Sequence, residues 1–244
     1  MCPTCLQNIV TPNGQFCLRC GGRRFVLAGS AEDCFRCRTA QFRFQRAIVL
    51  GEYRNDLRWF ILRMKTDRTG ILAISAATVL ANCRLSDLKS VGAEIIVPVP
   101  MHRVRRADRG NNSPDSIAEE LGRRLNIPVA KHLVRRIHHT ALQYTLSHRA
   151  RADNVHGAFA LHSPNFWETL VALARTAKST GQKNKKTNRI ADLSGKTVLL
   201  VDDILTSGAT CNEVTKVLLA AGARSVTVAA LARAEGKFIA AHRK

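Results

Sequence analysis

Small, acidic and hydroxyl-bearing residues between positions 202 and 210 are the part of the sequence best suited to bind a phosphorylated sugar. A run over residues 197–201 that is typical of a buried strand ends at two carboxylates, and a short loop and a helix follow. Backbone amides at a helix start bind phosphate, and carboxylates bind sugar hydroxyls or a hydrated cation. We expect a ribose-5-phosphate site; the alternative is an ordinary strand end and helix cap. The predicted site residues are Asp202, Asp203, Thr206, Ser207, Gly208, Ala209 and Thr210.

Six of the eight cysteines lie within the first 37 residues, where they form three Cys-x-x-Cys pairs. Zinc binds four thiolates at the corners of a tetrahedron, and each such pair supplies two of them. Either the first and second pairs or the second and third pairs could share one ion. We favour the second and third, because Gly21-Gly22 lets backbone amides turn toward the sulfur atoms. The predicted zinc ligands are Cys17, Cys20, Cys34 and Cys37.

The other cysteines have several interpretations. Cys2 and Cys5 are idle, or they are half of a second zinc site whose other pair would lie upstream of the sequence given. Reactive or redox thiols are the alternative to metal ligands for all three pairs. Cys83 and Cys211 have no such partner and fall within predicted helices, which favours small buried core residues.

The charge of the chain favours an anionic partner. Lys and Arg number 38 against 18 Asp and Glu, so the formal net charge is +20. Such a chain attracts nucleic acid, phosphates or an acidic membrane surface; the alternative is an organism whose proteins are generally basic. Apolar residues make up 45% of the chain, which is typical of a globular protein and excludes a largely disordered one.

The elements that would position these residues alternate between strands and helices. Strands are predicted over residues 47–51, 94–99, 197–201 and 225–232, and helices over 57–64, 71–82, 113–125 and 214–221. Ser113 is the predicted N-cap of its helix, with Pro114 next. This alternation predicts an α/β fold with a parallel sheet. The polar, basic residues 178–189 are predicted to form a mobile loop.

No stretch of the sequence predicts a membrane span, since the longest apolar run, residues 71–81, is far shorter than the roughly 20 residues that a span needs. No basic segment followed by an apolar stretch marks a secretion signal. We therefore expect a cytoplasmic protein without disulfides.

Residues 198–210 resemble the phosphoribosyl pyrophosphate (PRPP) motif of type I phosphoribosyltransferases, and the whole chain resembles the ComF family of cytosolic proteins linked to natural competence. The resemblance implies a type I phosphoribosyltransferase-like parallel sheet with helices on both faces, preceded by a small zinc ribbon. The domains that we expect are a truncated double zinc ribbon over 1–45 and a phosphoribosyltransferase-like domain over 46–244. The resemblance is carried, in chain order, by the Cys-x-x-Cys pairs, Lys65, Val97-Pro98-Val99-Pro100, Arg109-Gly110, Gln143, Arg149, Asn154, Gly157-Ala158-Phe159 and the motif at 202–210.

The sequence departs from the family pattern at several places. The family usually has Arg-Gly-Phe-Asn-Gln where this chain has Arg109-Gly110-Asn111-Asn112-Ser113, and Ser207 replaces a second threonine. Residues 167–190 form a longer linker than usual. The first Cys-x-x-Cys of the double ribbon is missing, which makes Cys2 and Cys5 half of its first site.

The resemblance also implies roles for the site residues. Residues 206–210 would cradle the 5-phosphate, while Asp202 and Asp203 would face the ribose hydroxyls and the magnesium that accompanies PRPP. No acceptor site and no catalytic residue can be named. The groups that would face the pyrophosphate or cover the ligand are residues 98–103, Arg149 and a lid over 139–157.

Three functions fit the sequence. The first is binding of PRPP and single-stranded DNA in competence and DNA use, with competence-machinery proteins as further partners. Arginines beside Phe35, Phe42 and Phe44 suit single strands, although a small ribbon core is the alternative for these phenylalanines. The second is an active phosphoribosyltransferase in nucleotide salvage with an unknown acceptor. The third is a DNA-binding regulator that senses PRPP.

Overall fold

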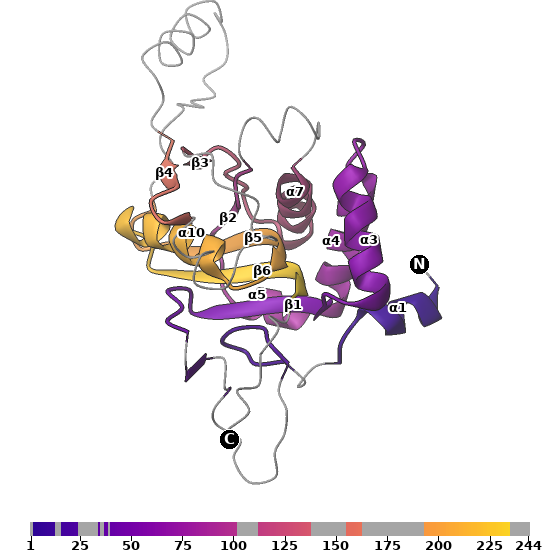
Figure 1. Ribbon diagram of the computed structural model, residues 1–244. Coiled ribbons are helices and arrows are strands. Elements are labelled where there is room, and N and C mark those ends of the chain that lie inside the picture. The colour runs from indigo at the N-terminus through magenta and orange to yellow at the C-terminus, as the bar shows by residue number, and fades with distance from the viewer. Residues whose placement is uncertain are drawn as a thin grey trace, which may run out of the picture.

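Four parallel strands form the central sheet of the protein (Figure 1). The computed structural model describes residues 2–12, 16–23, 34, 37–38, 40–101, 112–137, 155–162 and 193–234. The strand order is β1-β6-β5-β2, and every neighbouring pair is parallel. The bounds are Arg46–Glu52 for β1, Ser225–Arg233 for β6, Thr197–Leu205 for β5 and Ile95–Pro98 for β2.

The two central strands, β5 and β6, are largely buried because helices pack on both faces of the sheet. Residues 198–201 are fully buried, which fits the continuous aliphatic runs of parallel strands covered on both faces. The predicted end of β5 at residue 201 was wrong, because the strand continues to Leu205. Its pairing with β6 extends through Asp202 opposite Ala230 and Leu205 opposite Arg233. Asp202 and Asp203, the two acids of the motif at 202–210, therefore lie inside the strand.

Helices cover both faces of the sheet, which confirms the predicted fold class (Figure 1). On one face, helices pack their apolar side chains on Ile48, Leu199 and Leu231. On the other face, α10 (Ala209–Ala220) packs Val214 and Leu218 against the sheet. The helices of the first face are α1 (Pro3–Ile9), α3 (Asn55–Thr66), α4 (Ile71–Cys83), α5 (Leu85–Ser90) and α7 (Ser113–Leu125).

Helix α3 is built from a simple apolar repeat, and α7 from strong end signals. Leu57, Ile61 and Met64 are buried at the i, i+4, i+7 spacing that places them on one face. Helix α7 has the predicted span, but the residue that caps it is Asn112 instead of Ser113. None of the described helices is both long and apolar enough to cross a bilayer.

Several elements were not predicted from the sequence. They include α1, α5 and the antiparallel pair β3 (Val134–Arg136) and β4 (Phe159–Leu161). Each is short, so too few residues repeat to give a periodic signal. The predicted mobile loop at 178–189 lies outside the described residues.

The N-terminal segment is bound to the edge strand β1. The Thr11 amide donates to the Leu50 carbonyl and the Ala47 amide to the Leu18 carbonyl, each at 3.1 Å. Arg84 is buried directly after α4 and donates to the carbonyls of Leu50 and Thr11. It therefore joins α4, β1 and the N-terminal segment. Burial lowers the pKa of this guanidinium.

Candidate functional site

The two carboxylates of the predicted phosphate site lie on opposite faces of β5. Side chains alternate along a strand. Asp203 reaches α3, where its Oδ2 lies 3.1 Å from Lys65 Nζ. Asp202 faces α10, where its Oδ2 lies 3.6 Å from Cys211 Sγ. The structure thus brings both acids to the carboxyl half of the strand but gives each a different neighbourhood.

Burial sets the protonation chemistry of the inner acid. It raises the pKa of Asp202 to about 7, and the negative charge of Asp203 adds to the shift. The Asp203 amide donates to Asp202 Oδ1 at 2.8 Å and opposes it. Burial, with Asp202 beside it, also raises the pKa of the Cys211 thiol well above its ordinary value, so this thiol is neutral.

Residues 206–208, which we call the phosphate loop, turn the chain from β5 into α10. Gly208 has φ 85°, in the left-handed region that favours glycine. The Ala209 amide donates to Ser207 Oγ at 3.3 Å and closes the turn at the helix start. The loop thus ends at the N-terminus of a twelve-residue helix, where anions bind readily.

A buried arginine orients the peptide groups of this loop. Arg233, at 1% exposure, donates from Nη1 to the carbonyls of Leu205 at 3.0 Å and Thr206 at 2.5 Å. In a trans peptide the carbonyl and the following N–H point in opposite directions, and no described peptide is cis. The amides of Thr206 and Ser207 therefore face away from the buried guanidinium. This orientation is the one that a phosphate group requires.

The carboxyl end of β2 lies beside the same edge of β5. The Val99 amide donates to the Val201 carbonyl at 2.8 Å, and Asn112 Nδ2 donates to the Val99 carbonyl at 3.5 Å. Ligands of open parallel sheets bind outside such carboxyl ends. The described end of the predicted lid also reaches α10, where the Gly157 amide donates to Glu213 Oε2 at 3.2 Å. Arg103, Gln143, Arg149, Asn154 and residues 139–154 lie outside the described part of the chain.

Four cysteines form a cluster whose spacing fits a metal ion. We call Cys17, Cys20, Cys34 and Cys37 the cysteine cluster; their sulfur atoms all lie within 4.8 Å of one another. The Sγ atoms are 3.7 Å apart between Cys17 and Cys37 and 3.6 Å between Cys20 and Cys34. Four sulfurs at about 2.3 Å from a tetrahedral zinc would be about 3.8 Å apart. These are the second and third pairs, the pairing that the glycine argument favoured.

The protonation of the cluster also favours a cation. A hydrogen bond from Cys20 lowers the pKa of Cys17 to about 4, while burial raises the pKa of Cys37 to about 12. Without a cation, one thiolate in the cluster disfavours deprotonation of its neighbours, whereas a divalent ion would stabilise all four thiolates. The Gly22 amide, 3.4 Å from Cys20 Sγ, donates to the sulfur as predicted. Cys5 lies on α1 and Cys2 is the N-cap of that helix; both are exposed and neither belongs to the cysteine cluster.

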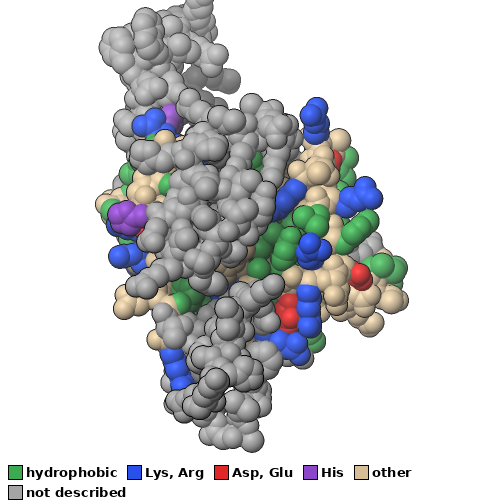
Figure 2. Space-filling view, viewed as in Figure 1, with side chains coloured by type: hydrophobic (Ala, Val, Ile, Leu, Met, Phe, Trp, Pro, Cys, Tyr) green, Lys and Arg blue, Asp and Glu red, His purple; other side chains and the backbone are tan. Residues whose placement is uncertain are grey.

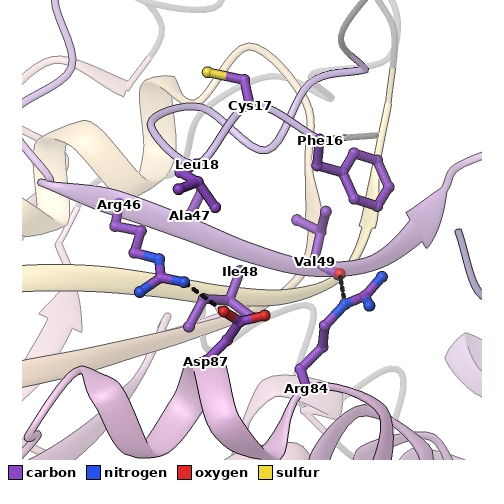
Figure 3. A pocket seen from close by; sticks show the side chains of 9 residues that line it. All are labelled: Phe16, Cys17, Leu18, Arg46, Ala47, Ile48, Val49, Arg84 and Asp87. Carbon is purple, nitrogen blue, oxygen red and sulfur yellow. Dashed lines mark hydrogen bonds and ion pairs between the residues drawn. The ribbon is translucent and has the colours of Figure 1, made fainter. Parts of the chain in front are cut away.

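A shallow hollow beside the cysteine cluster is a structural joint. Leu18 points toward β1, and Cys17 lies on the loop above the strand with its sulfur turned away from it, as Figure 3 shows. Its charged groups bind within the protein: Arg46 pairs with Asp87 at 2.6 Å, and Arg84 Nε donates to the Val49 carbonyl at 2.9 Å. These side chains hold the ends of α4 and α5 against β1.

Several residues around the sites were missed from the sequence. Arg233 ends an otherwise apolar strand, and that isolated charge was a usable signal. Contacts of Cys211 with Asp202 and of Phe42 with the phosphate loop join distant positions, which no local pattern predicts.

The family of the chain follows from comparison with known proteins. Residues 124–239 match the phosphoribosyl transferase domain. The chain is 30% identical over 240 residues to "Competence protein F" of Haemophilus influenzae, which covers 96% of this chain and 90% of that protein. It is 27% identical over 236 residues to the "DNA utilization protein YhgH" of Escherichia coli K12, and 26% identical to its namesake in Salmonella typhimurium, with the same coverages of 96% and 90%. The matched residues include β5, α10 and β6, the elements that carry or adjoin the motif at 202–210. The chain belongs to the competence protein F family.

Proposed function

We propose that the chain binds PRPP with magnesium at the carboxyl end of β5. The observation that carries the proposal is the phosphate loop, whose Thr206 and Ser207 amides face away from the buried Arg233 at the start of α10. The phosphoribosyl transferase domain match supports the same ligand. Magnesium would supply positive charge to the pyrophosphate.

The two acids would divide the work at this site. Asp203 is paired with Lys65 at the end of α3, and its carboxylate can accept bonds from ribose hydroxyls. Lys65, half-buried beside it, would turn to the pyrophosphate once the hydroxyls occupy Asp203. Asp202 would support the loop from inside the fold, because Cys211 and the Asp203 amide already use its oxygens.

Titration calorimetry with PRPP and magnesium tests this site. Asp203→Asn should weaken binding by about tenfold or more, since a hydrogen bond to a charged group contributes about 1.5–3 kcal/mol. Asp56→Asn is the matched control, because Asp56 lies exposed on α3 with Asn8 as its partner. Equal affinity in wild type and Asp203→Asn would contradict the proposal.

We further propose that the chain handles single-stranded DNA in competence or DNA use, the processes in the names of its relatives. The specific observation is the outer face of α3, where Trp59 is 61% exposed and Leu62 is 43% exposed. The guanidinium of Arg63 lies 5.2 Å from the Trp59 ring centre, and Arg58 is exposed beside it. Figure 2 shows hydrophobic and basic side chains together on this side of the molecule. Aromatic rings among arginines suit stacked bases and phosphates.

This surface replaces the one expected from the sequence. Phe44 is fully buried and Phe42 stacks on it with 4.8 Å between ring centres, so both belong to the hydrophobic core on the α10 face of the sheet. Phe35 lies outside the described residues. The single-strand site that we propose is therefore the α3 face instead of the ribbon.

Fluorescence anisotropy with a labelled single strand tests this second proposal. Trp59→Ala should weaken binding roughly tenfold, because stacking contributes about 1–3 kcal/mol per base. Ile71→Ala, with the same 61% exposure on α4, is the control and should bind as wild type. Affinity should fall steeply between about 50 and 200 mM salt; a flat salt response would refute the proposal.

Transfer activity and the identity of the metal complete the proposal. Pyrophosphate release from PRPP with bases, nucleosides or single strands would make the chain a phosphoribosyltransferase and name its acceptor. Binding without release would make it a PRPP sensor that binds DNA. We propose zinc for the cysteine cluster because four thiolates at tetrahedral spacing are its preferred set.

The division into a ribbon at 1–45 and a second domain at 46–244 stays a prediction.

A further inference from the structure

Residues 41–44, which we call the bridge segment, contact the start of the phosphate-binding helix. The Arg43 amide donates to Asn212 Oδ1 at 2.5 Å, and Asn212 Nδ2 donates to the Gln41 carbonyl at 3.4 Å. The Asn212 amide in turn donates to the Gly208 carbonyl at 2.8 Å. The bridge segment is therefore bonded to the same side chain whose backbone closes the first turn of α10.

Phe42 lies directly against the phosphate loop. A Cβ atom added to Gly208 would be 2.8 Å from Phe42 Cε1 and 3.3 Å from Phe42 Cδ1. The ring thus occupies the space that any larger residue would need, and it limits where Gly208 can move. Phe42 itself rests on Phe44, a fully buried ring. Phe42 and Phe44 therefore limit the movement of the phosphate loop on the side that faces the bridge segment.

The other end of the bridge segment is bound to the cysteine cluster. Arg19 lies between two of the cluster residues, Cys17 and Cys20, and donates from Nη2 to the Phe42 carbonyl at 2.6 Å. Its guanidinium also lies 6.0 Å from the Phe44 ring centre. Within the described part of the chain, Arg19 and Phe42 therefore connect the cysteine cluster to the phosphate loop.

We propose that Arg19 and Phe42 are positioning residues that couple metal binding at the cysteine cluster to anion binding at the phosphate loop. A metal ion fixes residues 17–20 by holding both cysteines that flank Arg19. The fixed Arg19 holds Phe42 against Gly208, so the loop is already ordered when PRPP arrives, and less ordering entropy opposes binding. Without metal, residues 17–20 are less constrained, so Arg19 positions Phe42 less firmly and the phosphate loop is less ordered. This inference rests on the proposed PRPP site.

Coupling of this kind is reciprocal. If metal raises the affinity for PRPP by some factor, PRPP raises the affinity for metal by the same factor. A merely structural ribbon would not respond to PRPP. Slower zinc release in the presence of PRPP and magnesium is therefore the signature that separates positioning from general stabilisation.

The first test uses variants that keep the cluster intact. Arg19→Ala and Phe42→Leu should each weaken PRPP binding by about tenfold, within the ordinary range of coupling between sites, with zinc content unchanged. Arg19→Lys, which keeps one donor for the Phe42 carbonyl, should recover part of the affinity. Leu18→Ala removes the exposed neighbour of Arg19, and Arg224→Ala removes a positive charge at the opposite end of β6. Both controls should bind PRPP as wild type.

The second test reads the loop without PRPP. Hydrogen exchange of residues 206–212 should speed up when a chelator removes zinc from the wild-type chain, and in Arg19→Ala, while exchange in α7 stays unchanged. Unchanged exchange at 206–212 in both samples would overturn the proposal, and so would zinc release that PRPP does not slow in a chain that binds it. If zinc protects the loop but wild type binds no PRPP, the coupling stands and the proposed ligand fails.

Discussion

Single residues decide the shape of the phosphate site. Asp202 and Asp203 are neighbours in sequence, yet strand alternation sends one to α10 and the other to Lys65 on α3. Arg233 lies outside the motif at 202–210, yet it donates to two carbonyls of that motif, those of Leu205 and Thr206. The site is thus made by residues inside the sheet as much as by the motif itself.

Gly208 should be the position in the loop least tolerant of a side chain. Gly208→Ala should destabilise the fold by about 1–3 kcal/mol and abolish PRPP binding, because φ 85° disfavours alanine and the new methyl meets the Phe42 ring at 2.8 Å. Gly195→Ala is the control: its φ of 70° carries a similar backbone cost, but nothing lies within 4 Å. Urea unfolding and calorimetry measure both effects. Equal losses in the two variants would show that the Phe42 contact contributes nothing.

The long elements could be predicted from sequence, and the short ones could not. Helix α3 repeats its apolar residues over three turns, and β6 is a run of nine residues that is mostly apolar, so local pattern was sufficient. The extension of β5 to Leu205 depends on pairing with β6, and the β3–β4 pair depends on a partner 25 residues away. The motif at 202–210 was recognisable in the sequence because consecutive residues carry it, and its ligand stays a prediction. Arg233 and Phe42 reach the same loop only through the tertiary fold.

The contact between α4 and α7 offers a test of stability against pH. Glu120, at 7% side-chain exposure, accepts from Arg123 at 2.8 Å and from Thr78 Oγ1 at 3.0 Å. The Arg123 bond, with Arg124 and Thr78 adding to it, lowers the pKa of Glu120 from 4.5 to about 2. A lowered carboxylate pKa stabilises the folded state fully above the ordinary value, and this contribution is lost as the pH falls toward the folded value.

Glu120→Gln should therefore lower the free energy of unfolding by about 1–3 kcal/mol at pH 7. The difference from wild type should shrink as the pH falls from 4.5 to about 2, where both side chains are neutral. Glu119→Gln, exposed on the same helix and paired with Lys131, should change little at any pH. Urea titrations across this range measure the effect, and a difference independent of pH would contradict it.

The whole molecule joins a thiol-rich N-terminal segment to a basic phosphoribosyl transferase-type sheet. The two parts share contacts: Ile9 of α1 packs with Leu57 of α3, and Phe44 belongs to the core of the other face. Metal binding or loss at the cysteine cluster should therefore also change the stability of the sheet. The net charge of +20 surrounds this assembly and attracts polyanions as a whole, which no single patch explains.

Metal removal should therefore destabilise more than the N-terminal segment. A chelator should lower the melting temperature of the full chain, because the bound ion stabilises only the folded state. Cys20→Ser should reduce zinc content from about one ion per chain to almost none, whereas Cys5→Ser, exposed on α1, should keep it. Elemental analysis and calorimetry measure both. Zinc lost equally in the two variants would assign Cys5 to the metal site.

The strand order has a consequence for the chain as it leaves the ribosome. Strands β1 and β2 are made early, but in the described sheet β1 pairs with β6 and β2 with β5, not with each other. A nascent chain that has not reached residue 197 can form none of these strand pairs. The β2 segment must wait until residue 197 has been made and the β1 segment until residue 225, and chaperones protect chains during such intervals. The β5-α10-β6 unit, which follows both in chain order, supplies the template on which the earlier strands assemble.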